Sequence, residues 1–121
     1  MTLQTVLRAV SKVRAPVVLE ETDLHDIIAS ALSDAGIAYW REKRVGACRL
    51  DFLCQGGIAI EVKRGKPPRR LLYAQLARYT GLSEVRGIVV ASEAPVSLPA
   101  SMAGKPVYNV ALRGLWGVAL P

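Results

Sequence analysis

The 121-residue sequence is poor in the residues that build metal clusters and disulfide frameworks. It has one histidine, two cysteines and one phenylalanine, and aromatic residues make up 6% of the chain. Cys48 and Cys54 lie on one predicted strand and cannot bridge each other there, and no cysteine or histidine nearby has zinc-site spacing. Free thiols of this kind fit a reducing cytosol, which predicts a cytoplasmic protein.

Long apolar runs are also missing. Hydrophobic residues make up 51% of the chain, yet no run is long enough to span a membrane and there is no signal-peptide core, so we expect no membrane partner. We find no internal repeat, and this length fits one domain with a substantial core. The predicted organisation of residues 1–121 is an N-terminal helical extension over 1–15, a core over 20–92, and a C-terminal loop with closing strands over 93–121.

Acidic residues are scarce where basic residues gather. The net charge is +6, and nine of the sixteen lysines and arginines lie between Arg41 and Arg70, against three acids in that span. A basic field around a small acidic centre suits a polyanionic substrate with a metal ion at the acids, so nucleic acid is the predicted partner. The predicted phosphate contacts are Arg41, Lys43, Arg44, Arg49, Arg64, Lys66, Arg69 and Arg70.

The acidic centre lies in a predicted β-hairpin over residues 48–63, CRLDFLCQGGIAIEVK. Gly56 and Gly57 mark its reversal, since glycine adopts a positive φ without a Cβ penalty. A three-residue loop places Cys54 opposite Ile58 and gathers apolar side chains on one face that can be buried. A two-residue loop would instead turn an acid toward the core. The hydrophobic pattern therefore selects the first register.

In this register Asp51 lies opposite Glu61, while Leu50, Phe52 and Cys54 share the apolar face. Two carboxylates that face each other repel and destabilise a sheet, so a purely structural role gives no reason for the pair. A divalent cation between them does, because Mg²⁺ and Mn²⁺ prefer carboxylate oxygen. The hairpin therefore predicts a metal site at its two acids.

Lys63 lies two residues after Glu61 and so points to the same face of its strand, where it can orient a water molecule or steady a phosphate under attack. An acid on one strand and E-x-K on the next form the core of the PD-(D/E)xK nucleases, and Asp51, Glu61 and Lys63 resemble that core. The resemblance implies a restriction-endonuclease-like α/β fold, an αβββαβ core with a mixed sheet flanked by helices. It also implies that Asp51, Glu61 and the backbone carbonyl of Val62 hold Mg²⁺, for which Mn²⁺ can substitute.

A helix is predicted from about Glu20 to Ala35, ending at Gly36. Glu21 and His25 lie four residues apart, on one edge of its apolar stripe. The stretch ETDLHDIIASALSDAGI resembles the start of a VRR-NUC domain, where a glutamate is followed four residues later by a glutamine and a glycine ends the helix. The resemblance implies that Glu21 completes the metal site, directly or through water, with His25 beside it in place of the glutamine. Glu20 is the alternative acid.

A second helix follows the proline-stiffened basic loop RGKPPRR, and Gln75 and Tyr79 share one side of it. Q-x-x-x-Y after the E-x-K strand occurs in RecB-like nucleases, and QLARY resembles it. The resemblance implies that Gln75 helps to hold the attacking water or the DNA, with Tyr79 beside it. The β-branched run 88–92 predicts a central strand parallel to the E-x-K strand, and closing strands are predicted over 107–112 and 116–120.

The combined expectation is a small metal-dependent nuclease that hydrolyses DNA phosphodiester bonds. Small stand-alone VRR-NUC members look like structure-specific or junction-cleaving endonucleases that act as dimers, so the resemblance implies such an endonuclease and a homodimer. A silent nucleic-acid-binding module of the same fold and an interaction protein whose helix over 2–14 docks a partner are the alternatives from other classes. An RNA-directed nuclease is a third alternative, because the site contacts phosphate rather than sugar.

Overall fold

The computed structural model describes residues 3–13 and 20–112, apart from the side chain of Glu21. The closing strand predicted over 116–120 lies outside this part of the chain. None of the described helices combines the length and the apolar character needed to cross a membrane. The elements are α1 (Leu3–Ser11), α2 (Glu21–Asp34), β1 (Tyr39–Val45), β2 (Cys48–Cys54), β3 (Ile58–Lys63), α3 (Arg69–Thr80), β4 (Gly87–Ser92), β5 (Ser101–Met102) and β6 (Lys105–Ala111).

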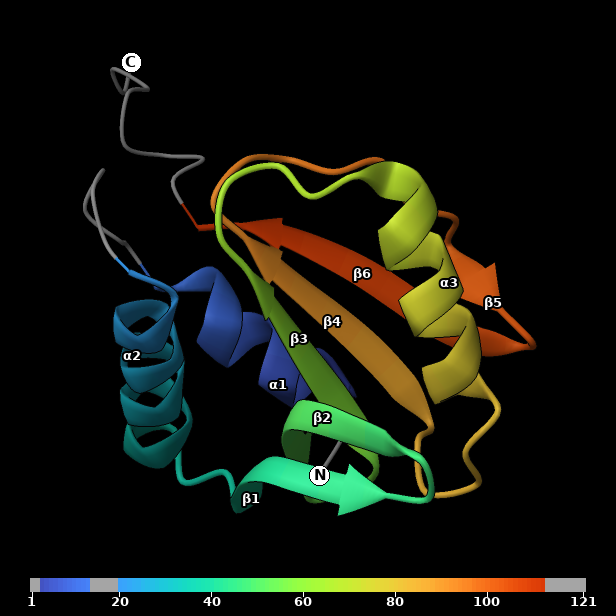
Figure 1. The fold of residues 1–121 in the computed structure, drawn as a ribbon. Helices are drawn as coiled ribbons and strands as arrows, with labels where there is room; N and C mark the ends of the chain where they lie inside the picture. The colour runs from blue at the N-terminus through green and yellow to red at the C-terminus, as the bar shows by residue number, and fades with distance from the viewer. Residues whose placement is uncertain (1–2, 14–19, 113–121) are drawn as a thin grey trace.

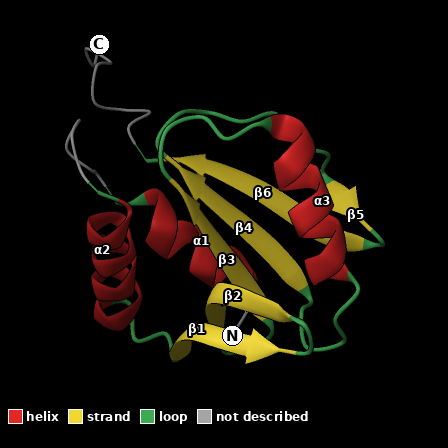
Figure 2. Cartoon of the chain, in the orientation of Figure 1, coloured by secondary structure: helices red, strands yellow, loops and turns green. Residues whose placement is uncertain are grey.

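The strands form a mixed sheet in the order β1-β2-β3-β4-β6-β5. The first three strands pair antiparallel, whereas β4 pairs parallel to β3 and β6 pairs parallel to β4. The predicted parallel pairing across α3 is therefore confirmed. Figure 1 shows α3 in front of β4 and β6, α1 behind β3, and α2 at the left of the sheet. Figure 2 shows the same α/β architecture, with helices flanking the sheet.

Each face of the sheet has its own apolar cluster. On one face α1 and α2 pack against the strands, and Val6, Leu24 and Phe52 are fully buried there. On the other face α3 contributes Leu72 and its neighbours. Complete burial of one such side chain stabilises the fold by roughly 2 kcal/mol. The predicted N-terminal helical extension over 1–15 thus includes α1, whose buried side chains belong to this core.

The β2–β3 hairpin has the predicted register next to its turn. Phe52 pairs with Ile60, and Cys54 pairs with Ile58. The turn uses the predicted geometry, since Gly57 has a φ of +84° and its N–H donates to the Cys54 carbonyl at 3.0 Å. Beyond Phe52 and Ile60 no further β2–β3 pairs form in the described strands. The ladder therefore ends one residue before Asp51 would pair with Glu61.

The predicted apolar face of β2 is wrong at its first residues. Phe52 and Cys54 pack in the cluster with α1 and α2, whereas Leu50 packs in the cluster with α3. The alternation of side chains is reset between them, opposite Glu42, which has a φ of +54°. Cys48 also packs on the α3 side, so the two free cysteines lie on opposite faces. Burial raises the pKa of the Cys54 thiol to about 12.

Candidate active site

Glu61 lies near the end of β3, and its side chain is 5% exposed. Lys63 Nζ lies 3.0 Å from Glu61 Oε2. Gln75 Nε2 donates to the same oxygen at 3.0 Å, and the Tyr79 hydroxyl donates to Oε1 at 2.9 Å. Lys63 points to the same face of β3 as Glu61 because it is two residues further along an extended strand. Gln75 and Tyr79 share one side of α3 because they are four residues apart. The structure thus brings four predicted site residues together.

Asp51 reaches the same place from β2 and is buried. Its Oδ2 accepts a hydrogen bond of 2.8 Å from the Val62 backbone N–H. The carboxylate therefore occupies the position where a backbone carbonyl would continue the ladder, which explains why the β2–β3 pairing stops before it. His25 Nε2 of α2 lies 3.8 Å from the same oxygen. Asp51 is thus placed at an opening of the sheet, between α2 and the site around Glu61.

The two carboxylates repel each other, and the Lys63 ammonium offsets this repulsion only in part. Burial and then the charge of Asp51 raise the pKa of Glu61 to about 7, against the opposing effects of the Lys63 ammonium and the Tyr79 hydrogen bond. Burial and the charge of Glu61 also raise the pKa of the Tyr79 hydroxyl, which keeps it a hydrogen-bond donor at neutral pH. A proton or a bound cation between the acids relieves this repulsion.

The donors at this opening suit a hard divalent cation. In an extended strand the N–H and C=O of one residue point to the same edge. The Val62 N–H points to Asp51, so the Val62 carbonyl also points to this opening and adds a third oxygen to the two carboxylates. Oxygen ligands of this type are those that Mg²⁺ prefers. Within residues 3–13 and 20–112, however, no three histidine, cysteine or acidic side chains gather into a metal-binding group.

The α2 helix brings His25 to the site, where the ring is buried and its centroid lies 5.9 Å from that of Phe52. Glu21 begins the helix four residues earlier, and its side chain lies outside the described part. Glu20 is exposed and is the N-cap residue, and its N–H donates to the Asp23 carboxylate at 3.2 Å. Glu20 therefore has a local role in starting the helix.

The predicted basic residues of β1 do not converge on the acids. Arg41 forms an ion pair of 2.8 Å with Asp26 of α2, so it joins that helix to the sheet. Lys43 Nζ lies 5.7 Å from the ring centroid of the exposed Trp40. Arg44 is exposed at the far end of the strand. Lys43 and Arg44 remain accessible to a polyanion, whereas the Arg41 guanidinium already has a carboxylate partner.

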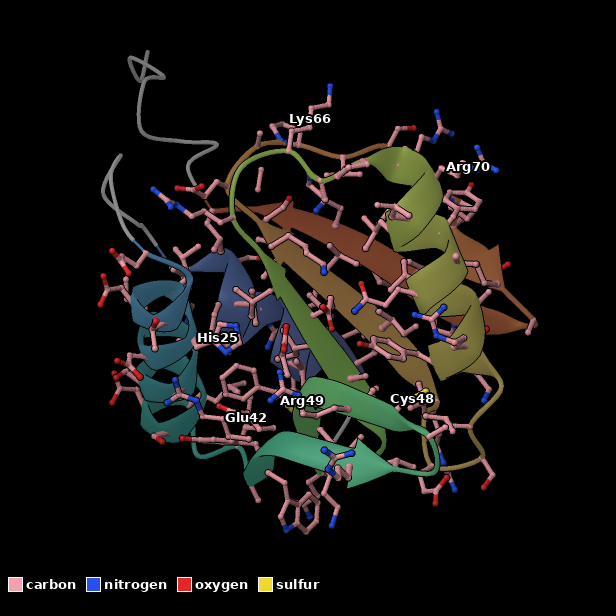
Figure 3. The ribbon with its side chains drawn as sticks, in the orientation of Figure 1. His25, Glu42, Cys48, Arg49, Lys66 and Arg70 are labelled. Carbon is pink, nitrogen blue, oxygen red and sulfur yellow. The ribbon has the colours of Figure 1, made fainter. Side chains whose placement is uncertain are left out.

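The other predicted basic residues lie on two sides of the site. Figure 3 shows Arg49 near α2 and β2, with Lys66 and Arg70 at the top of the view. Arg64, Lys66, Arg69 and Arg70 are all exposed, on the loop after β3 and the first turn of α3. The site is therefore flanked by accessible cations rather than surrounded by a continuous basic surface.

Glu93 is a buried acid near the site that the sequence patterns did not single out. It directly follows β4, and its Oε1 accepts a hydrogen bond of 2.5 Å from the Gly65 N–H and lies 4.0 Å from Arg64 Nε. It thereby anchors the start of the basic loop. The available signal was an acid directly after a predicted parallel strand beside the E-x-K strand, since ligand sites form at the carboxyl ends of such strands.

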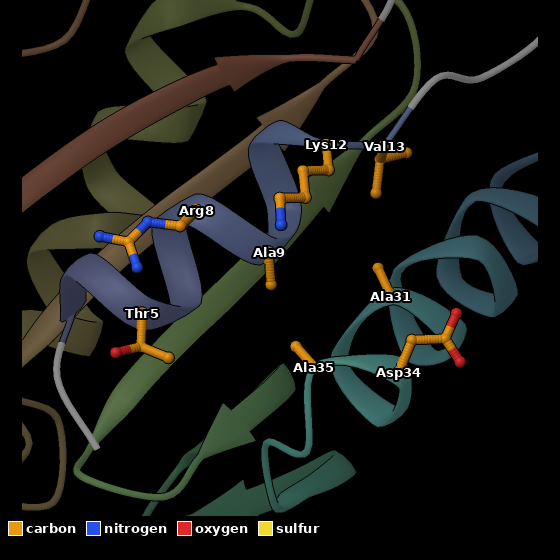
Figure 4. A pocket seen from close by; sticks show the side chains of 8 residues that line it. All are labelled: Thr5, Arg8, Ala9, Lys12, Val13, Ala31, Asp34 and Ala35. Carbon is orange, nitrogen blue, oxygen red and sulfur yellow. The ribbon is translucent and has the colours of Figure 1, made fainter.

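A separate groove of about 500 Å³ lies between α1 and α2 (Figure 4). Arg8 of α1, Lys12 directly after that helix and Asp34 of α2 line it, together with small apolar side chains. Its helices cover the sheet face opposite α3, whereas Glu61 contacts α3. The groove is therefore not a continuation of the carboxylate site, and the side chains lining it are not among the predicted site residues.

Comparison of the chain with protein-family models, with curated proteins and with solved structures gives no match in any of the three. The described residues themselves define an α/β protein whose mixed sheet opens at a buried pair of acids.

Proposed function

We propose that this chain is a metal-dependent nuclease of the PD-(D/E)xK type. The observation that carries the proposal is the buried acid pair at the open end of the β2–β3 hairpin, with Lys63 Nζ 3.0 Å from Glu61 and the Asp51 carboxylate on the Val62 N–H. A buried acid whose pKa is raised by burial and by a neighbouring acid is costly for folding alone. The order α2-β1-β2-β3-α3-β4 supports the proposal, because it matches the αβββαβ core that the resemblance implies.

The chain's own residues divide the work of phosphodiester hydrolysis. Asp51, Glu61 and the Val62 carbonyl would hold Mg²⁺ or Mn²⁺, which supplies a water of lowered pKa and stabilises negative charge on the phosphate. Lys63 would orient the attacking water. Gln75 donates to Glu61 and keeps that carboxylate in one orientation. We assign the third acid to Glu21 from its sequence position, four residues before His25.

DNA is the proposed substrate, and its phosphates would contact the accessible cations on both sides of the site. A structure-specific endonuclease acting as a homodimer is the form that the VRR-NUC resemblance implies, since one chain offers one catalytic centre and a two-strand cut needs two. The phosphate contacts we assign are Lys43, Arg44, Arg49, Arg64, Lys66, Arg69 and Arg70. Arg41 is a weaker candidate, because its guanidinium is paired with Asp26.

The test is a cleavage assay on labelled single strands, duplexes, flaps and four-way junctions, in Mg²⁺, in Mn²⁺ and in EDTA. We expect cleavage that requires the metal and that falls by about 100-fold or more in Lys63→Ala, the scale of loss when a group that positions or transfers a proton is removed. Lys12→Ala is the matched control, because Lys12 is an exposed lysine directly after α1 and lies outside the acid site. It should cleave like the wild type, and far-UV circular dichroism should show both variants folded.

A catalytically silent nucleic-acid-binding module is the second candidate. It is favoured by one observation, that no third metal-binding side chain joins the two acids within the described residues. Binding of nucleic acid without cleavage of any substrate in either metal would sink the catalytic proposal and support this module. RNA oligonucleotides belong in the same assay, because cleavage of RNA but not DNA would identify an RNA-directed nuclease.

A further inference from the structure

Glu42 has a backbone conformation that its place in the strand does not explain. Among the described residues, the two non-glycines with a positive φ are Glu42 at +54° and Ala103 at +51°. Ala103 and Gly104 form the tight turn between β5 and β6, where such angles are required. Glu42 lies in the middle of β1. A non-glycine residue in this region is strained, and strain of this kind clusters at functional sites.

The strained residue faces the opening of the sheet. The β1–β2 pairs on either side keep one register, which puts Glu42 at the level of Asp51. Glu42 Oε1 lies 3.2 Å from Arg49 Nη1 (Figure 3). The Arg49 carbonyl accepts a hydrogen bond of 3.2 Å from the Tyr79 hydroxyl, which lies 2.9 Å from Glu61. The Arg49 backbone is thus fixed to the acid site, and its side chain is held by Glu42.

This ion pair is poorly suited to a role in stability. The side chains of Glu42 and Arg49 are 55% and 57% exposed, and exposed pairs contribute little to folding. Such a pair does not by itself account for a strained backbone. A guanidinium, however, has several N–H donors in a planar fork, so Arg49 can keep its contact with Glu42 at Nη1 and still donate to a phosphate.

We propose that Glu42 is a positioning residue, which holds the Arg49 guanidinium ready for a backbone phosphate of the nucleic acid beside the acid pair. This role rests on the proposed nucleic-acid substrate. An arginine that is already oriented loses less conformational freedom when the phosphate binds, which increases affinity. With a φ of +54° at Glu42, its carboxylate lies 3.2 Å from the Arg49 guanidinium.

The test measures binding of a labelled DNA duplex in EDTA, where metal-dependent cleavage cannot interfere. Arg49→Ala should weaken binding and reduce the slope of log affinity against log salt by about 1, as expected for one lost phosphate contact. Glu42→Gln removes a negative charge, so on charge alone it should bind DNA more tightly. The positioning role predicts the opposite sign, a loss of about threefold.

A double variant separates positioning from a general charge effect. Glu42→Gln should cause no further loss of binding when it is added to Arg49→Ala, because Glu42 acts through that arginine. Glu84→Gln and Arg8→Ala are matched controls, since both residues are exposed and neither contacts the acid pair. The first should bind as tightly as the wild type or more so, and the second should keep most of its affinity.

The results distinguish failure of the role proposed for Glu42 from failure of the proposed nuclease. Equal or tighter binding by Glu42→Gln, or unchanged binding by Arg49→Ala, overturns the positioning role whatever the cleavage assay shows. Binding without cleavage overturns only the nuclease, and a wild type that binds no nucleic acid overturns both. Glu42→Gly should weaken binding as well, yet raise the melting temperature by a few degrees because glycine is unstrained at this φ. A lower melting temperature in Glu42→Gly would show that the backbone of Glu42 is not strained, which contradicts the basis of the role.

Discussion

The two ends of the β2–β3 hairpin differ in what determines their structure. At the turn, Cys54 and Phe52 pair in register with β3, and glycines provide the reversal. At the open end, the Asp51 carboxylate takes the Val62 N–H, and the ladder stops. Local backbone preferences and apolar alternation are sufficient at the first end. At the second, one buried side chain competes with the backbone for a hydrogen bond and changes the path of the strand.

The difference separates the end of the hairpin that stabilises the fold from the end to which we assign the proposed chemistry. Residues at the turn end are apolar and buried, with Ile58 and Ile60 in the core cluster. The open end holds the repulsion between Asp51 and Glu61 and the strained backbone of Glu42, and both features work against folding. A fold tolerates such features where surrounding packing overcomes them, and features of this kind cluster at functional sites, which supports the function proposed for this end.

The largest expected effect is a loss of stability from a substitution at the turn end of the hairpin. In Gly57→Ala the added Cβ would lie 2.7 Å from the Glu84 carbonyl oxygen, at a φ of +84°. Strain and a displaced backbone together should lower the free energy of unfolding by about 4 kcal/mol, measured by chemical denaturation. Gly104→Ala is the control, with a φ of +77° and no neighbour within 4 Å, and should lose about 1 kcal/mol. Equal losses would mean that the contact with Glu84 does not matter.

The second effect is a pH dependence that arises at the open end. Because the folded-state pKa of Glu61 is about 7 and the ordinary value is 4.5, the metal-free folded protein binds the extra proton between these values. Protonation of Glu61 therefore stabilises the folded state by about 3 kcal/mol. This stabilisation is complete below pH 4.5 and is lost as the pH rises through 7. Denaturation in EDTA from pH 5 to 8 should show this decline.

Glu61→Gln tests whether that decline belongs to this carboxylate. The variant has no proton to lose at this position, so its stability should change much less between pH 5 and 8 than that of the wild type. Glu84→Gln, at an exposed acid, should keep the wild-type slope. A decline of equal size in Glu61→Gln would assign the pH dependence to another group.

The smallest expected effect comes from removing a single hydrogen-bonding group beside Glu61 at the open end. Tyr79→Phe removes the hydroxyl that contacts Glu61 and the Arg49 carbonyl, and should cost about 1 kcal/mol of stability. Because the Tyr79 hydrogen bond lowers the pKa of Glu61, its loss should move the pH-dependent decline to higher pH. Tyr108→Phe is the control, at a tyrosine 38% exposed on β6, and should change neither quantity. An unshifted decline in Tyr79→Phe would contradict the contact with Glu61.

Much of the fold followed from local patterns. The predicted helix from about Glu20 to Ala35 corresponds to α2, and Gly36 has the left-handed φ of +71° expected after a helix end. The E-x-K strand and the turn at Gly57 also occur as predicted. These features depend on periodicity and on residues adjacent in sequence, which is why the sequence contains enough information for them.

The candidate site was only partly predictable. Glu61, Lys63, Gln75 and Tyr79 converge because strand alternation and helical spacing are regular. The pairing of Arg41 with Asp26 is a contact between two elements, which no local pattern reports.

By itself the sequence determined most of the elements, though not the short strand β5, as well as the turn of the hairpin and the residue types that meet at the acids. Tertiary structure alone decided that Asp51 caps the Val62 N–H, that Glu42 adopts a positive φ and that Leu50 packs on the α3 side. The physical reason is the range of the interactions. Periodicity and glycine conformations act over a few residues, whereas a buried carboxylate finds its partner across strands and resets the backbone to reach it.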